Sequence, residues 1–193
     1  PGELVARFGF RRYGFHGLAH ASLVEQLAAA TGRPHSAVDA VTLQLGAGCS
    51  ACAVAAGRSV ETSMGYTPLE GLVMATRSGD LDPAIILSLL RAGFDADDIE
   101  ATLVRASGLT ALAGTSDMRE ILAAESLGDT DAGFALKLFC HRIVLTAGAY
   151  FTLLAGRGAL VFGGGIGTNS PEIKAIMKLL NFSGSGLWII IHM

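Results

Sequence analysis

The sequence predicts a mixed α/β domain in which helices pack on an antiparallel strand meander. The first of three observations is a set of short strand-like segments, Ala40–Leu45, Cys49–Ala55 and Arg58–Thr62, separated by glycine-containing turns. The second is a series of capped apolar helical segments that follows them. The third is a length of 193 residues with 51% hydrophobic content, which is enough to bury a core.

Along the sequence, one helix is expected before the meander, at residues 20–31, and three after it, at 84–92, 96–106 and 129–154. Gly32 is a helix stop, Asp82 and Asp95 are N-caps, and Asp129 or Thr130 opens the last helix. A short buried strand should follow at 159–162, then a glycine loop at 163–169. Ser170-Pro171 should cap one more helix.

Composition narrows the class of protein. The 14 basic and 17 acidic residues give a net charge of −3, which argues against a protein that tracks nucleic-acid phosphates or binds membranes through basic residues. The apolar stretch at 143–156 is shorter than the ~20 residues that a membrane span needs, so we expect a buried helix. No signal peptide is visible, and we expect the chain to begin within a longer one.

The cysteines are expected to be structural. Cys49 and Cys52 have a C-x-x-C spacing, but strand alternation would place them on opposite faces of the sheet. We interpret these two and Cys140 as reduced core residues of a cytosolic protein.

Three glycine-containing loops, at 44–48, 76–80 and 163–169, predict a nucleotide held between strand turns, because the chain has no Walker lysine motif. Arg77 could reach an anion from its loop, or it could form an ion pair with Asp80 or Asp82. His16 lies between glycines and could approach a substrate, whereas His20 should begin a helix and pack or cap. A zinc pair of these two histidines has little support.

Five segments, in order along the chain, resemble the acetate/propionate kinase family. They read Arg-Arg-Tyr-Gly-Phe-His-Gly at 11–17, Thr-Ser-Met-Gly-Tyr-Thr-Pro-Leu-Glu-Gly-Leu at 62–72, Thr-Arg-Ser-Gly-Asp-Leu-Asp-Pro at 76–83, Ser-Asp-Met-Arg at 116–119 and Gly-Gly-Ile-Gly-Thr-Asn-Ser-Pro at 164–171. The resemblance runs from about Arg11 to about Ile173. It implies the actin, Hsp70 and sugar-kinase (ribonuclease H-like) fold, in which two domains close on ATP.

The resemblance also implies roles for single residues. His16 matches the histidine that contacts the transferring phosphoryl group, and Arg77 matches the arginine that stabilises its charge. The residues implied to bind ATP or ADP are Gln44, Leu45, Gly46, Ala47 and Gly48 in the phosphate loop, Asp117, Met118 and Arg119 around the adenosine, and Gly165, Ile166, Gly167, Thr168 and Asn169 on its other side.

Some positions depart from the family. The family phosphate loop commonly reads His-Leu-Gly-Asn-Gly, where this chain has Gln44 and Ala47, and Thr168 stands where glutamate is usual. The family's Asn-x-Gly-Ser-Ser-Ser strand, substrate arginine, catalytic aspartate and late glutamate near magnesium have no counterpart. We therefore expect residues 1–180 to be a nucleotide-binding domain without its amino-terminal partner, and 181–193 to be an atypical tail.

The resemblance implies the reaction of ATP and acetate to give ADP and acetyl phosphate. It also implies that the full-length protein is a homodimer located in the cytoplasm. Mg²⁺ is implied as well, with ligands mainly outside this chain. The chain alone should be inactive, and neither nucleic acid nor membrane is expected as a partner. The alternatives are a non-catalytic nucleotide-binding module and a propionate or butyrate kinase. A nucleotide site also requires Gly46–Gly48 to lie near Gly165–Asn169 across a cleft.

Overall fold

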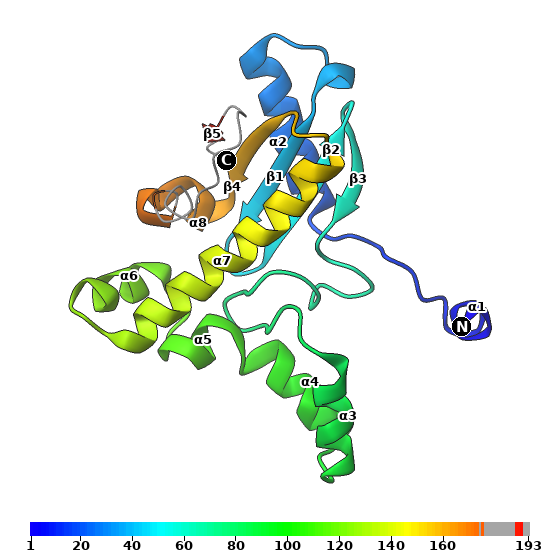
Figure 1. The fold of residues 1–193 in the computed structure, drawn as a ribbon, viewed down its shortest axis with the longest axis vertical. Coiled ribbons are helices and arrows are strands. Elements are labelled where there is room, and N and C mark those ends of the chain that lie inside the picture. The colour runs from blue at the N-terminus through cyan, green and yellow to red at the C-terminus, as the bar shows by residue number, and fades with distance from the viewer. Residues whose placement is uncertain (174, 176–187, 191–193) are drawn as a thin grey trace.

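The computed structural model, which describes residues 1–173, 175 and 188–190, is built on a five-stranded sheet (Figure 1). The strands lie in the order β3-β2-β1-β4-β5. Their bounds are β1 Ala40–Leu45, β2 Cys49–Ala55, β3 Arg58–Thr62, β4 Ala159–Gly163 and β5 Trp188–Ile190. The first three form the predicted antiparallel meander, and β4 pairs with β1 in parallel. Because β1 and β4 are parallel, their carboxyl ends meet at one edge of the sheet.

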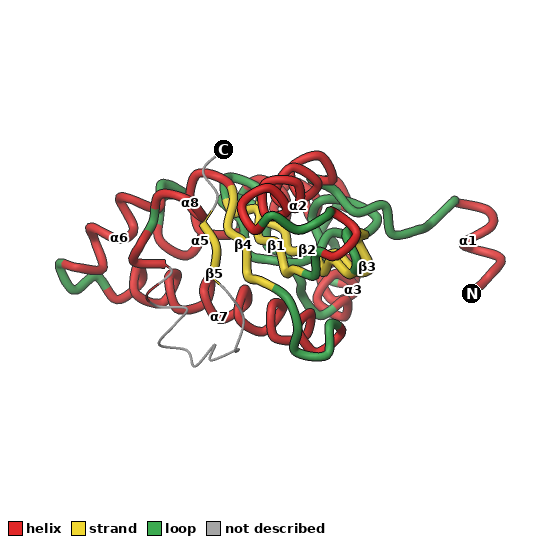
Figure 2. Tube along the Cα trace, turned by 90° about the horizontal axis from the view of Figure 1, so that it is seen from above, coloured by secondary structure: helices red, strands yellow, loops and turns green. Residues whose placement is uncertain are grey.

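Each face of the sheet is covered by a long helix. Helix α7 (Thr130–Leu153) lies on one face and α2 (Gly17–Thr31) on the other, and Figure 2 shows the three layers from above. Leu43 packs in the larger core with α7, whereas Val54 and Val161 pack in the smaller core with α2. This alternation follows from the two-residue repeat of a strand.

Other described helices lie beyond the carboxyl ends of β1 and β4 (Figure 1). They are α3 Pro83–Arg91, α4 Ala96–Arg105, α5 Gly108–Ala113, α6 Met118–Ser126 and α8 Gly164–Asn169. The short helix η1 His35–Ala37 instead directly precedes β1. The predicted caps are confirmed: the carboxylates of Asp82, Asp95 and Asp129 accept hydrogen bonds from backbone amides in the first turns of α3, α4 and α7.

Several expectations about elements were wrong. The expected glycine loop is helix α8, and α2 begins at Gly17 rather than at His20. Helices α5 and α6 were not predicted. Within the segment 181–193, expected to be an atypical tail, Trp188–Ile190 form β5, which pairs with β4 in parallel. The expected helix after Ser170 is seen at residues 171–173 and 175, and its continuation lies outside the described residues.

The cysteine interpretation is confirmed in its structural part. Cys49 of β2 and Cys140 of α7 pack in the core between the sheet and α7. Cys52 packs in the core on the opposite face of the sheet. Burial raises the pKa of Cys49 and of Cys140 to about 12, so these side chains are neutral thiols at ordinary pH.

Helix α7 has the length and composition of a membrane-spanning helix, but its packing explains its apolar character. Phe139, Ile143 and Ala147 lie on one side of α7 and are buried against the sheet. The expectation of a buried helix is confirmed for this side.

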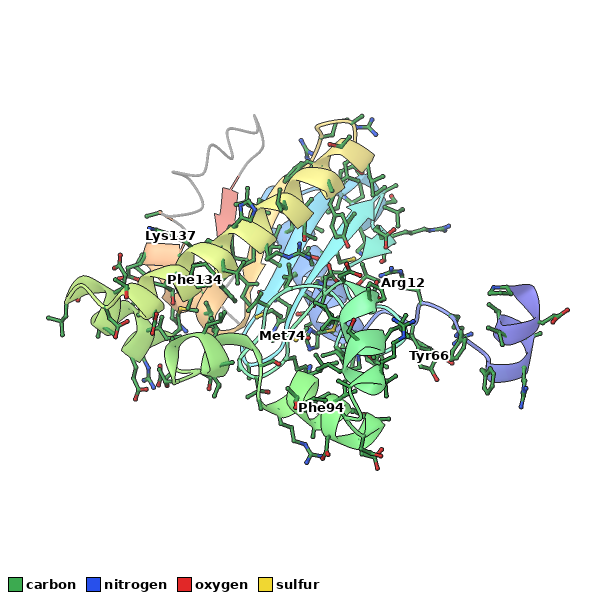
Figure 3. All side chains as sticks on the ribbon, turned by 60° about the horizontal axis from the view of Figure 1, so that its bottom comes forward. Arg12, Tyr66, Met74, Phe94, Phe134 and Lys137 are labelled. Atoms are coloured by element: carbon green, nitrogen blue, oxygen red, sulfur yellow. The ribbon has the colours of Figure 1, made fainter. Side chains whose placement is uncertain are left out.

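A helix that was not predicted, α1 (Gly2–Phe8), precedes these layers. None of its residues is buried, and Figure 1 shows it away from the rest of the molecule. The segment after it is attached to the loop that follows β3: the Phe10 and Tyr66 rings lie edge to face, and the Arg12 guanidinium donates to Glu70 at 2.8 Å. Figure 3 labels Arg12 and Tyr66 where this segment meets the body.

Candidate active site

His16, Gly48 and Arg77 meet beside the turn between β1 and β2. A Cβ atom placed on Gly48 would lie 3.2 Å from His16 Cε1, 3.3 Å from His16 Nε2 and 3.5 Å from Arg77 Nη1. The imidazole and the guanidinium therefore flank a position that has no side chain. The structure thus brings together both predicted catalytic residues and one end of the predicted phosphate loop.

Local backbone geometry holds these groups in place. His16 is the N-cap of α2 and has a left-handed conformation, φ 61° and ψ 22°, which is uncommon for a residue other than glycine. The Ala75 amide donates to the Ala47 carbonyl at 3.1 Å, which ties the Arg77 loop to the β1–β2 turn. Backbone strain of this kind clusters at functional positions.

The β1–β2 turn also presents backbone amides. The Gly46 amide donates to the Gly48 carbonyl at 3.2 Å, which closes the turn. Within the described residues, the amides of Ala47 and Gly48 donate no hydrogen bond. Ala47 is exposed. Amides in such a turn can bind an anion without a polar side chain at position 47.

Arg77 makes no ion pair among the described residues, so the alternative of a pair with Asp80 or Asp82 is not observed. Asp80 pairs with Arg142 at 2.6 Å, and the Asp82 carboxylate caps α3. The Arg77 guanidinium donates to the Pro68 carbonyl at 3.4 Å. Its positive charge faces His16 and is not neutralised by a neighbouring carboxylate.

Behind His16, buried hydroxyl and imidazole groups form a continuous row. His16 Nδ1 and His20 Nε2 each lie 2.8 Å from Ser50 Oγ, and His20 Nδ1 lies 2.8 Å from Thr42 Oγ1. The expectation that His20 packs inside the fold is confirmed. Ser50 and Thr42 were not singled out from the sequence, although polar residues at inward-facing positions of apolar strands were the available signal.

Both histidines of this row are biased toward the neutral form. Burial, and secondly the charge of Arg77, lowers the pKa of His16. Burial, and secondly His16, lowers the pKa of His20 to about 4. His20 is therefore neutral at pH 7.

Gln44 and Leu45 lie where β1 meets α8. Gln44 Oε1 is buried and has no hydrogen-bond partner among the described residues. Gly164 has φ +78°, and a Cβ on it would lie 2.4 Å from the Leu45 carbonyl oxygen. The start of α8 and the end of β1 therefore touch, so the two predicted glycine segments begin at one edge of the sheet. Whether Gly46–Gly48 and Gly165–Asn169 face one nucleotide across a cleft stays a prediction.

The predicted residues in α8 differ in their exposure. Gly165 and Asn169 are exposed, and Ile166 is partly buried. Gly167 and Thr168 are buried, and the Thr168 hydroxyl donates to the Gly164 carbonyl at 2.9 Å. Of these five, Gly165 and Asn169 are the most accessible to a ligand.

The predicted adenosine segment forms a separate group at the start of α6. The Asp117 carboxylate accepts from the Arg119 amide at 2.9 Å and pairs with the Arg119 guanidinium. Met118 is buried, and α6 packs mainly against α7. These bonds stay within one helical turn and do not join the segment to His16 or Arg77.

The described residues do not form a cation site. No group of three or more histidine, cysteine, aspartate or glutamate side chains converges among them. The side chains beside Gly48 are an imidazole and a guanidinium, whereas Mg²⁺ prefers oxygen ligands. The two side chains beside Gly48 therefore do not suit Mg²⁺, and the described residues contain no all-protein cage for it.

Comparison with known proteins extends over nearly the whole chain. A family model described as the acetokinase family matches residues 1–187. An acetate kinase of Pseudarthrobacter chlorophenolicus is 47% identical over 177 residues, which is 92% of this chain and 46% of that protein. The chain thus spans about half the length of the curated relatives it matches.

Solved structures agree with this match. A propionate kinase from Francisella tularensis superposes with a TM-score of 0.94 at 34% identity, covering 100% of this chain and 55% of that one. An acetate kinase from Porphyromonas gingivalis gives 0.93 at 29% identity, with the same coverage. The expected fold class is confirmed by these neighbours.

Proposed function

The chain belongs to the acetokinase family, and from this premise we propose that it is the nucleotide-binding part of an enzyme that transfers a phosphoryl group between ATP and acetate. The products in the forward direction are ADP and acetyl phosphate. The observation that carries the proposal is the meeting of His16 and Arg77 at Gly48, beside a turn in which two amides have no hydrogen-bond partner among the described residues.

The chemistry requires charge neutralisation more than proton transfer. A carboxylate is already ionised at neutral pH, so the attacking group needs no strong base. The main obstacle is the approach of one anion to another. Arg77 can offer two N–H donors to phosphoryl oxygens, and it is the fixed positive charge beside Gly48. Loss of such a group typically costs on the order of 3 kcal/mol of transition-state stabilisation.

We place the ATP phosphates over Gln44–Gly48 and the rest of the nucleotide toward Gly165–Asn169 and Asp117–Arg119. The first two segments share the carboxyl edge of β1 and β4, where ligands bind in open α/β sheets. The third segment is assigned by the family resemblance.

Magnesium belongs to the proposed reaction, but the described residues do not supply a cage for it. Mg²⁺ in kinases is commonly held by substrate phosphates and only one or two carboxylates. We propose that its protein ligands lie outside this chain.

The organisation of the whole protein is part of the proposal. We propose that residues 1–180 form the nucleotide-binding domain, that a further domain closes on ATP from the other side, and that the enzyme is a cytoplasmic homodimer acting on small molecules. The exposed apolar residues Ile85, Leu87 and Phe94 of the α3–α4 region offer a surface that a second copy could cover.

A matched pair of variants tests this function in the protein that carries the chain. Gly48→Ala would place a methyl group 3.2 Å from the His16 ring, in the position assigned to the phosphoryl group. Gly148→Ala is the control, because Gly148 lies in α7, outside the assigned phosphate loop, and no described atom lies within 4 Å of its new methyl group. We expect Gly48→Ala to lower acetyl phosphate formation, detected as hydroxamate, at least tenfold more than Gly148→Ala does, with similar melting temperatures. The 193-residue chain alone should form none. Equal activity of the two variants would reject the assigned position.

Propionate is a second candidate acceptor. The solved propionate kinase reported above has nearly the same fold and is slightly more identical to this chain than the solved acetate kinase. Comparing kcat/KM for acetate and propionate in the same protein decides between them. A higher value for acetate is expected, because the curated relatives named above are acetate kinases.

A further inference from the structure

The loop at residues 62–72, here called the bridging loop, contacts both of the segments that carry the proposed catalytic residues. We propose that Arg12 and Glu70 are positioning residues. Their hydrogen bond holds the segment before His16 on the bridging loop and thereby sets the position of His16 relative to Arg77. The inference rests on the proposed function, because it concerns the placement of two residues assigned to that reaction.

The bridging loop is attached to the loop that carries Arg77. Its Pro68 carbonyl accepts a hydrogen bond from the Arg77 guanidinium at 3.4 Å. Gly71 and Asp80 form two further hydrogen bonds between the loops. The Asp80 amide donates to the Gly71 carbonyl at 2.9 Å, and the Gly71 amide donates to the Asp80 carboxylate at 2.7 Å. The bridging loop is therefore a fixed support for Arg77.

The segment that leads to His16 has little backbone attachment to the rest of the fold. Among the described residues, the backbone of 10–15 makes a single hydrogen bond to another backbone group, from the Tyr13 amide to the Gly65 carbonyl at 2.9 Å. Since His16 follows shortly after Tyr13, a shift of this segment would displace the imidazole from its place beside Gly48. The position of the segment therefore depends on side-chain contacts as well.

Arg12 supplies these contacts. Its guanidinium donates to the Thr62 carbonyl and to the Glu70 carboxylate, each at 2.8 Å, and Figure 3 labels Arg12 at this place. Glu70 lies directly against Gly65, because a Cβ atom placed on Gly65 would overlap the Glu70 carboxylate. The absence of a side chain at position 65 thus leaves the space in which Glu70 reaches Arg12.

The exposure of this ion pair favours a role in the reaction over a role in stability. The side chains of Arg12 and Glu70 are 46% and 43% exposed, and exposed ion pairs contribute little to the free energy of unfolding. Placement matters more for turnover, because a shift of ~1 Å in a reacting group can lower a rate about a hundredfold. Loss of the pair should therefore affect kcat more than the melting temperature.

The experiment removes this ion pair in the protein that carries the chain. We expect Arg12→Ala to lower kcat about tenfold while the KM for ATP and the melting temperature stay nearly unchanged. Arg157→Ala is the matched control and should keep its kcat. Arg157 is also exposed and has a carboxylate, Asp39, at 3.7 Å, but it lies before β4, at the end of that strand opposite to α8.

The Glu70 partner gives a second variant. Glu70→Gln should lower kcat in the same direction as Arg12→Ala, because it removes the charge that holds the guanidinium. The double variant should be no slower than the slower single variant, since both substitutions break one interaction. Two independent, additive losses would contradict a shared role of Arg12 and Glu70.

A His16→Ala background shows whether Arg12 acts through His16. Arg12→Ala should have little further effect there, because the group to be positioned is gone. An equal loss of kcat in both backgrounds would show a merely structural role and would overturn the proposal. A loss no greater than that of Arg157→Ala would overturn it as well.

Imidazole ¹H–¹⁵N NMR of the 193-residue chain gives a readout that needs no turnover. Arg12→Ala should shift the His16 signals, and Arg157→Ala should leave them in place. Unchanged His16 signals in Arg12→Ala would also count against the proposal. A failure of the proposed kinase function would be seen separately, as an absence of acetyl phosphate formation by the unsubstituted protein.

Discussion

Arg77 and Arg142 are both partly buried, but only Arg142 has a carboxylate beside its guanidinium among the described residues. Arg142 has a carboxylate partner, Asp80, at 2.6 Å, whereas Arg77 has neutral contacts with the Pro68 carbonyl and Met74 sulfur. A positive charge kept beside another potential cation, His16, is not explained by stability. It is explained if an anion binds between them.

This difference gives a prediction at the residue scale. In the protein that carries this chain, Arg77→Lys should lower kcat by roughly a hundredfold and change the melting temperature little, because lysine cannot present two donors in a fixed plane. Arg142→Lys is the control, and it should keep near-normal turnover because its partner is a structural carboxylate. Measuring kcat and the melting temperature for both variants decides between the roles. Near-normal turnover with a lowered melting temperature for Arg77→Lys would assign it to the structure.

Single residues were predictable where a motif carried them. His16, Arg77 and Gly48 were found from their glycine-rich surroundings and family-like segments, and the structure places them together. Ser50 and Thr42 belong to no motif, and their importance depends on α2 lying over β1 and β2. That packing arises from contacts between distant segments and cannot be deduced from spacing alone.

At the scale of elements, the junction between β4 and α8 fixes one side of the candidate nucleotide site. Gly164 has φ +78° and has no room for a side chain against Leu45, whereas no atom of the described residues lies within 4 Å of a Cβ placed on Gly165. A side chain is thus excluded at the first of these two adjacent glycines but not at the second. The first is required by the packing, and the second leaves an exposed surface.

Alanine substitutions at these two glycines should therefore separate the roles. Gly164→Ala combines an unfavourable backbone conformation with a clash and should lower the free energy of unfolding by roughly 1–3 kcal/mol. Gly165→Ala should be neutral or slightly stabilising, because alanine favours a helix over glycine. Urea unfolding of both variants measures the difference. If Gly165→Ala proved as destabilising as Gly164→Ala, the packing account of the junction would be wrong.

Elements were predictable when local signals were strong. The bounds of β1 and β2 follow from short apolar runs between turns, and β3 follows from the Ala56-Gly57 turn before it. Helices α3 and α4 follow from their aspartate caps. Helix α5 has no side-chain cap, and it packs against α7. Helix α6 does have an aspartate cap, Asp117, but this segment was interpreted only as part of the adenosine site. A glycine-rich segment such as 163–169 has low helix propensity, so its helical form depends on tertiary contacts with β1 and β4.

The packing of α2 on the sheet buries His20, a residue of α2, and this burial makes the stability of the fold depend on pH. His20 is 5% exposed, and burial lowers its pKa to about 4 from a usual value of 6.5. The unfolded chain therefore binds a proton at this residue more tightly than the folded chain does. The pKa of His16 is lowered too, so its effect on stability has the same sign.

The stability that depends on neutral His20 should be fully present above pH 6.5 and should be lost as the pH falls toward about 4. A shift of this size corresponds to a loss on the order of 3 kcal/mol. The partly exposed Asp117 has its pKa lowered to about 2 by its hydrogen bonds with Arg119, so its contribution is lost in a separate, more acidic range. Urea unfolding at several pH values between 7 and 4 measures the loss, and His20→Gln should flatten it because glutamine does not titrate. An unchanged slope in His20→Gln would mean that other groups cause the acid sensitivity.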